Sequence, residues 1–169
     1  MNAFGYGKHR ATAEQQGDPR VLGGNAVTRR TLLELEALDR LAELERVTAS
    51  VDRCLDDLKA DAETRYAVQF AVEELFTNIV KYAFDDHIPH RVRIQLFHAG
   101  SELTLTMEDG GRPFDPTAAP VPDTTLALNE RPVGGLGLFL LRQMSSRMDY
   151  WRIASTNCVR VHFALPDAV

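Results

Sequence analysis

The chain has 169 residues, of which 44% are hydrophobic and 25% charged, a composition that indicates one globular domain rather than a fibrous or disordered protein. Two distant cysteines exclude a disulfide framework, and the lack of a long apolar run predicts a cytoplasmic protein that does not enter a membrane. The net charge of −5 argues against direct nucleic-acid binding, because affinity for phosphate backbones requires a basic surface.

The pattern of apolar residues divides the chain into an extension and a domain. Residues 1–28 show no regular hydrophobic period, so we expect a flexible N-terminal extension there, and residues 29–169 should form the domain. Its first elements are a strand over 30–37, where apolar residues alternate with glutamates, and a helix over 41–58, where apolar residues recur with helical spacing.

A longer helix is expected over residues 62–84, with Asp61 as its N-cap. Two alternating runs joined by a tight turn at Ala99-Gly100 then predict an antiparallel hairpin with one face buried. A proline-rich stretch of about twenty residues follows, which is longer than an ordinary connection and indicates a functional lid or disorder.

After this stretch the pattern predicts a helix over 136–148 and two strands over 149–154 and 158–165. The order of the elements is strand, helix, helix, hairpin, lid, helix and hairpin. It indicates the α+β class, with a two-layer sandwich of a mostly antiparallel mixed sheet and helices on one face.

The long helix carries a polar pair on a largely apolar surface. Glu74 and Asn78 are one helical turn apart, so their side chains should lie about 6 Å apart on the same face. A carboxylate beside a carboxamide suits a hard cation such as Mg²⁺, which keeps several waters and takes few protein ligands. A hydrogen-bonded pair that faces solvent is the alternative. Glu73 lies on a more polar stripe and is interpreted as a surface residue.

A second motif, Asp-Gly-Gly-Arg-Pro-Phe-Asp at 109–115, follows directly from the hairpin. Its paired glycines allow a sharp turn and a close approach of the backbone to a ligand, and Asp109 could accept a hydrogen bond from an exocyclic amine. An ordinary strand-to-loop turn with hydrogen bonding by the aspartate is the alternative.

A third motif, Gly-Gly-Leu-Gly-Leu at 134–138, opens the helix expected after the proline-rich stretch. Glycines at a helix N-terminus leave unpaired N–H groups and the positive end of the helix dipole available to an anion such as phosphate. Close packing of the backbone is the alternative. The motif lacks both the strand context of a dinucleotide-binding fingerprint and the lysine of a P-loop.

In this order and spacing, the three motifs resemble the Bergerat-fold (GHKL, HATPase_c) ATP-binding superfamily of gyrase, heat-shock chaperone, histidine kinase and mismatch-repair proteins. Within that superfamily the chain is most similar to the anti-sigma factor serine/threonine-protein kinases. The resemblance covers about residues 29–166, essentially the whole expected domain.

The resemblance implies a role for each motif. Asn78 would ligate an Mg²⁺ ion that bridges the triphosphate of ATP, and Glu74 would act as the general base. Asp109 would bind the adenine amine, Gly111 would leave room for the base, and residues 116–133 would form the lid. Further nucleotide contacts are implied for Phe114, Gly134, Gly135, Leu136, Gly137 and Leu138.

The implied activity is phosphorylation of a serine on a small anti-sigma factor antagonist of the STAS type, together with regulation of sigma-factor availability by a homodimer. Two alternatives are a non-catalytic module in which bound ATP sets the affinity for a partner, and a histidine-kinase-like ATPase domain. Glu74 disfavours the first, because a pure switch needs no base. The second is disfavoured because no histidine-bearing dimerisation helix is expected ahead of the domain.

Overall fold

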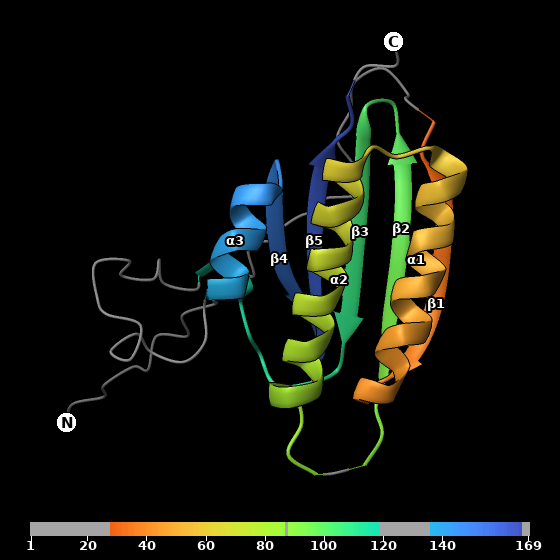
Figure 1. Ribbon diagram of the computed structural model, residues 1–169. Helices are drawn as coiled ribbons and strands as arrows, with labels where there is room; N and C mark the ends of the chain where they lie inside the picture. Colours follow the sequence, from red (N-terminus) through yellow and green to blue (C-terminus); the bar gives the residue numbers. More distant parts are fainter. Residues whose placement is uncertain (1–27, 87, 119–135, 167–169) are drawn as a thin grey trace, which may run out of the picture.

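A computed structural model describes residues 28–86, 88–118 and 136–166 (Figure 1). The predicted extension and most of the predicted lid therefore lie outside the described residues. The strands are β1 (Arg30–Leu38), β2 (Arg91–Ala99), β3 (Glu102–Asp109), β4 (Arg147–Ile153) and β5 (Thr156–Ala164). The helices are α1 (Leu44–Leu58), α2 (Ala62–Tyr82) and α3 (Leu136–Met144), with short 3₁₀ turns η1 (Leu41–Glu43) and η2 (Pro116–Ala118).

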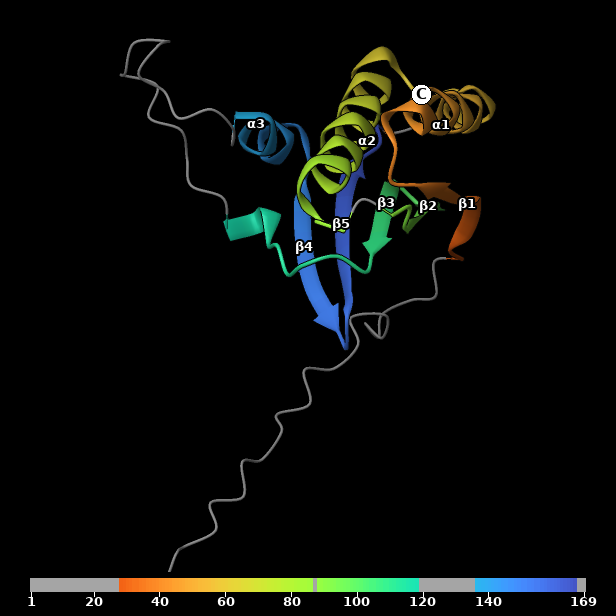
Figure 2. The same ribbon diagram turned by 90° about the horizontal axis from the view of Figure 1, so that it is seen from below.

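The five strands form one sheet in the order β1-β2-β3-β5-β4, and each neighbouring pair is antiparallel. Figure 2 shows that α1, α2 and α3 all lie on one face of this sheet. The predicted α+β sandwich with helices on one face is confirmed. Because β3 pairs with β5, the strand that leads into the second motif becomes a neighbour of the last strand of the chain.

The core lies between the helices and the sheet. The apolar stripes predicted on α1 and α2 face the sheet, where they pack against the apolar residues that alternate along the strands. Burying each large side chain contributes roughly 1.5–3 kcal/mol to folding. The buried set includes Val47, Val51, Leu55, Val68, Val72, Leu75, Phe76, Val92, Ile94, Leu96, Leu105, Met107, Val161 and Phe163.

Both ends of α2 are fixed by hydrogen bonds. At the N-terminus the Asp61 carboxylate accepts a hydrogen bond from the backbone N–H of Thr64 at 2.7 Å, so its predicted capping role is confirmed. The helix ends at Tyr82, two residues before the predicted end at Phe84. Beyond it, the carbonyl of Ala83 accepts the backbone N–H of Arg112 at 2.9 Å, which ties the end of α2 to the loop after β3.

The hairpin of β2 and β3 forms in the predicted place, and Gly100 in its turn has a φ of 61°, which glycine adopts without steric penalty. The expectation of one buried face fits β2 but is wrong for β3. Thr104 and Thr106, on the helix-free face, are both buried. β3 is the central strand of the five, and its cross-strand partners on that face, His162 and Arg160 of β5, are long side chains that are themselves buried.

The third helix ends earlier than the sequence predicts. α3 stops at Met144, four residues before the predicted end at Met148, and β4 begins at Arg147. Ser146 explains the difference, since its backbone N–H and its hydroxyl both donate to the carbonyl of His162 on β5, at 2.8 and 3.0 Å. A serine that bonds to the sheet in this way competes with continuation of the helix.

Candidate functional site

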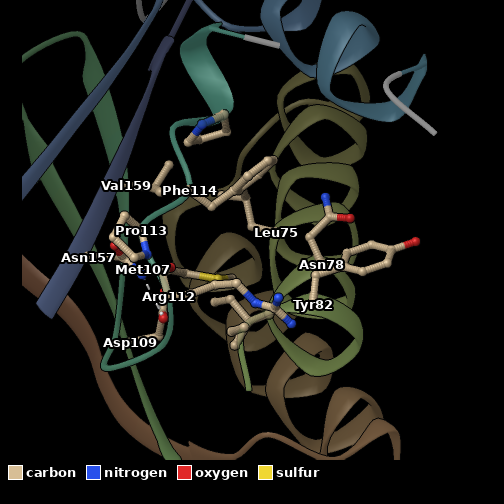
Figure 3. Close-up of a pocket in the computed structure, with 13 residues that line it drawn as sticks. Leu75, Asn78, Tyr82, Met107, Asp109, Arg112, Pro113, Phe114, Asn157 and Val159 are labelled. Carbon is tan, nitrogen blue, oxygen red and sulfur yellow. Dashed lines mark hydrogen bonds between the residues drawn. The ribbon is translucent and has the colours of Figure 1, made fainter. Parts of the chain in front are cut away.

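A pocket with a volume of about 220 Å³ opens between the C-terminal half of α2 and the loop after β3 (Figure 3). Apolar side chains from three elements line it: Leu75 and Ile79 of α2, Met107 of β3 and Val159 of β5. The volume is many times what one water needs. An apolar hollow with a few polar groups at its edge is the usual form of a site for a small organic ligand.

Asp109 is the main carboxylate of this pocket and the last residue of β3. Its side chain is buried, with 7% exposed. Oδ1 accepts the backbone N–H of Gly111 at 2.8 Å and the side-chain amide of Asn157 at 2.9 Å. Within the described ranges nothing donates to Oδ2, so this oxygen is available to a donor on a ligand.

Asn157 holds the aspartate in place, and the sequence analysis did not assign it to the site. It is 3% exposed and pairs with Asp109 across β3 and β5. Its amide nitrogen also donates to the carbonyl of Arg112 at 3.0 Å. Its carbonyl oxygen accepts the hydroxyl of Tyr150 at 2.9 Å and a guanidinium N–H of Arg152. Asn157 could be identified only from the register between β3 and β5, because a local sequence motif carries no information about strand pairing.

Gly111 is buried where the loop crosses the end of α2. A Cβ atom there would lie 2.6 Å from Ala83 Cβ, 2.7 Å from Ala83 O and 2.9 Å from Asp109 Oδ1. Its carbonyl accepts a hydrogen bond from Arg152 at 3.0 Å. Close packing within the protein is thus enough to require glycine at this position, and space for a base beside it stays a prediction.

Glu74 and Asn78 contact each other on α2, as their spacing predicts. The amide nitrogen of Asn78 donates to Glu74 Oε1 at 2.9 Å, and both side chains are half-buried. Asn78 also lines the pocket, whereas Glu73 is exposed. The pair is therefore hydrogen-bonded, as the alternative interpretation expected, but it adjoins the pocket and does not face open solvent.

The geometry of Asn78 is compatible with a magnesium ligand. Its amide nitrogen donates to Glu74, and none of the described residues donates a hydrogen bond to its carbonyl oxygen. In the same part of the chain, no group of three or more His, Cys, Asp or Glu is placed to hold a metal ion. An ion that takes one protein oxygen and completes its shell with water and phosphate oxygens fits this donor set.

The third motif is only partly described. Gly134 and Gly135 lie outside the described residues, whereas Leu136 and Gly137 begin α3. Leu138 is 4% exposed and belongs to the core, so its side chain stabilises α3 and does not face the pocket.

The structure thus brings the predicted residues into two neighbouring groups. Phe114 is 51% exposed and lines the pocket with Asn78 and Asp109. These three form the first group. The second is Glu74 with Gly137 of α3, and Glu74 lies one turn of α2 before Asn78.

Comparisons with known proteins bear on the family and the fold. Residues 37–163 match the family model of the histidine kinase-like ATPase domain. The serine/threonine-protein kinase BtrW of Bordetella bronchiseptica is 31% identical over 91 residues, which make up 54% of this chain. The match spans 64% of the length of that relative.

A solved structure is similar in fold. The RsbU and RsbW domains of Rv1364c from Mycobacterium tuberculosis align with a TM-score of 0.55 at 13% identity, over 79% of this chain and 31% of that one. Separately, none of the helices in the described ranges is long and apolar enough to cross a membrane.

Proposed function

Because the chain belongs to the histidine kinase-like ATPase domain family, we propose that it is an ATP-dependent protein serine kinase of the anti-sigma type. The observation that carries the proposal is the placement of Asn78 and Asp109 on the same apolar pocket (Figure 3). Glu74 is hydrogen-bonded to Asn78. One end of the pocket then suits a purine base, and the other suits a magnesium-bound phosphate chain.

At the base end, the free Oδ2 of Asp109 would accept a hydrogen bond from the exocyclic amine of adenine. The rings would pack over the buried Met107 and against the half-buried Ile79, and removal of the apolar surface of the rings and of Ile79 from water supplies the apolar part of the affinity. A buried acceptor of this kind selects against a base that presents a carbonyl in place of the amine, because two acceptors cannot bond to each other.

At the phosphate end, Asn78 would hold Mg²⁺ through its carbonyl oxygen. The ion, when bound, supplies neutralisation of the charge on the phosphate chain. Gly135 and Gly137 are proposed to present backbone N–H groups to the phosphates, with Gly134, Leu136 and Phe114 as neighbouring nucleotide contacts. Leu138 is proposed to contribute through its backbone only, because its side chain lies in the core.

Glu74 is the proposed general base. As the hydroxyl oxygen of a substrate serine forms its bond to the γ-phosphorus, the bond from that phosphorus to the β,γ-bridging oxygen breaks. The electron pair stays on the departing ADP, and the serine proton passes to the Glu74 carboxylate. Phosphoryl transfer depends mainly on positioning and on charge neutralisation, so one carboxylate beside the metal ligand is sufficient.

The proposed substrate is a serine on a STAS-type anti-sigma factor antagonist, and the proposed second partner is a sigma factor bound by a homodimer. Support comes from the motifs and from the relative that is named a serine/threonine-protein kinase. A nucleotide-dependent binding module without phosphoryl transfer is the second candidate. This candidate is supported by the hydrogen bond that Glu74 accepts from Asn78, because that bond occupies Oε1 of the proposed base.

The first test is incubation of the full chain with Mg-ATP and a purified STAS-type antagonist, with a serine-to-alanine variant of the antagonist as control. Phosphoserine on the antagonist supports the proposal. A nucleotide-dependent complex without phosphoserine would support the binding module, and phosphohistidine would place the chain with histidine kinases.

Variants of α2 test the individual roles. Glu74→Gln is expected to lower the transfer rate by roughly 10²–10⁴-fold while the Kd for Mg-ATP stays within a few-fold, because the base acts on the proton and not on binding. Asn78→Ala should lose the magnesium dependence of ATP binding. The matched control is Glu73→Gln, an exposed neighbour that should behave as the parent. Transfer at the parent rate by Glu74→Gln would exclude Glu74 as the base.

A further inference from the structure

Gly137, in the first turn of α3, lies directly against the carboxyl group of Glu74. A Cβ atom at position 137 would overlap all three terminal atoms of that side chain, Cδ, Oε1 and Oε2. The two glycines after β3 differ, since Gly111 faces the end of α2 first and Gly110 has nothing within 4 Å.

From this contact we propose that Gly137 is a positioning residue for the general base, an inference that rests on the proposed function. Its missing side chain leaves the space that the Glu74 carboxylate occupies between α2 and α3. Asn78 bonds to the carboxylate at 2.9 Å, and the α3 backbone limits its movement at Gly137. The proposed phosphate contact uses the backbone N–H of Gly137, and this contact adds a second role, orientation of Glu74, for its missing side chain.

The packing of α3 determines what a larger residue at position 137 would displace. Leu138 and Leu141 are 4% and 0% exposed and anchor the helix in the core, and Arg142 donates to the carbonyl of Thr117 at 3.0 Å. Moving α3 outward would therefore disturb buried contacts. The Glu74 carboxylate is the far end of a flexible, half-buried side chain, so it moves instead. The substitution should therefore displace the Glu74 carboxylate and leave the fold largely unchanged.

The decisive variant is Gly137→Ala. We expect the transfer rate to fall at least tenfold, while the melting temperature stays close to that of the parent and the Kd for Mg-ATP changes less than threefold. Leu140→Ala is the control, because it changes an exposed position of the same helix. A Kd that weakens in proportion to the loss of transfer would overturn the inference and leave Gly137 with phosphate binding alone.

A double-mutant cycle separates action through Glu74 from action elsewhere. In a Glu74→Gln background, Gly137→Ala should produce no further loss of transfer. Glu74→Asp, whose carboxylate retreats by one methylene, should be less sensitive to Gly137→Ala than the parent. Equal losses of rate in all three backgrounds would overturn the inference.

One readout does not depend on activity. In the nucleotide-free protein, displacement of the Glu74 carboxylate should shift the NMR resonances of the Asn78 side-chain amide in Gly137→Ala but not in Leu140→Ala. Unchanged Asn78 resonances in Gly137→Ala would overturn the positioning role. Shifted resonances in a protein whose parent transfers no phosphate would instead count against the proposed kinase function, so the two failures are distinguishable.

Discussion

Both ends of the Asn157 carboxamide are bonded within the protein, and this determines which oxygen of Asp109 can meet a ligand. The amide nitrogen occupies Oδ1, together with the N–H of Gly111. Tyr150 and Arg152 fix the other end of Asn157 so that the amide cannot rotate away. The remaining oxygen, Oδ2, is thus held in one orientation, and a held acceptor discriminates between ligands better than a mobile one.

Asn157→Ala should consequently weaken ATP binding and reduce the preference for ATP over GTP. Loss of the hydrogen bonds to Asp109 is expected to cost about 1–3 kcal/mol, or roughly 5–150-fold in Kd for ATP. Calorimetric Kd values for both nucleotides would measure the effect, and Thr156→Ala, at the exposed neighbouring residue, is the control. If the ATP to GTP ratio of Asn157→Ala equalled that of the parent, Asn157 would have no part in base selection.

The motif residues could be predicted from the sequence and Asn157 could not, because its partner is distant along the chain. Glu74 and Asn78 could be predicted together because helical geometry fixes neighbours four positions apart. Asp109 could be predicted from its place at the end of an alternating strand. Asn157 is 48 residues from Asp109, and only the antiparallel pairing of β3 with β5 brings the two together.

At the scale of elements, α2 carries the proposed base and metal ligand, and its first turn is held by a single side chain. Asp61 satisfies the backbone N–H of Thr64, a residue that is itself buried. Loss of this acceptor leaves a helix donor unpaired where water has little access. The sequence alone predicted this cap, because it depends only on local residues.

Asp61→Ala is expected to lower the free energy of unfolding by about 1 kcal/mol, which corresponds to a fall of roughly 2–4 °C in Tm. Thermal unfolding followed by circular dichroism is the measurement. Asp61→Asn, which keeps a side-chain acceptor, should recover most of the loss, and Glu73→Ala in the middle of the same helix should lie close to the parent. A Tm for Asp61→Ala equal to that of the parent would contradict the capping role.

The end of α3 and the two-sided burial of β3 were the element-scale errors, and both have a long-range cause. Helical periodicity continues past Met144, but Ser146 donates two hydrogen bonds to the carbonyl of His162, and β4 begins at the next residue. Likewise, alternation cannot reveal that β3 is the central strand, beside the buried side chains of Arg160 and His162 on β5. Local patterns predicted the type of these elements, while tertiary hydrogen bonds and strand order set their limits.

At the scale of the whole molecule, the predicted Bergerat-type architecture is confirmed by the match over residues 37–163 and by the similar fold of the RsbW-containing structure. The motifs could reveal it because their order along the chain matches the order of the elements: the first lies within α2, the second at the end of β3 and the third at the start of α3. The pocket itself is built by α2, β3, β5 and the loop after β3. A nucleotide that contacts all four stabilises the folded state against global unfolding, because the unfolded chain cannot form the pocket.

Mg-ATP should therefore raise the Tm of the parent. At a concentration 100 times its Kd, a ligand that binds only the folded state adds about 2.7 kcal/mol, which corresponds to several degrees for a domain of this size. Glu74→Gln should show the same rise, since the base does not hold the nucleotide, whereas Asn78→Ala should show a small rise that no longer depends on Mg²⁺. Thermal shift with ATP, GTP and each without magnesium distinguishes these cases. A parent whose Tm does not respond to Mg-ATP would contradict nucleotide binding and leave the fold as a nucleotide-independent interaction module.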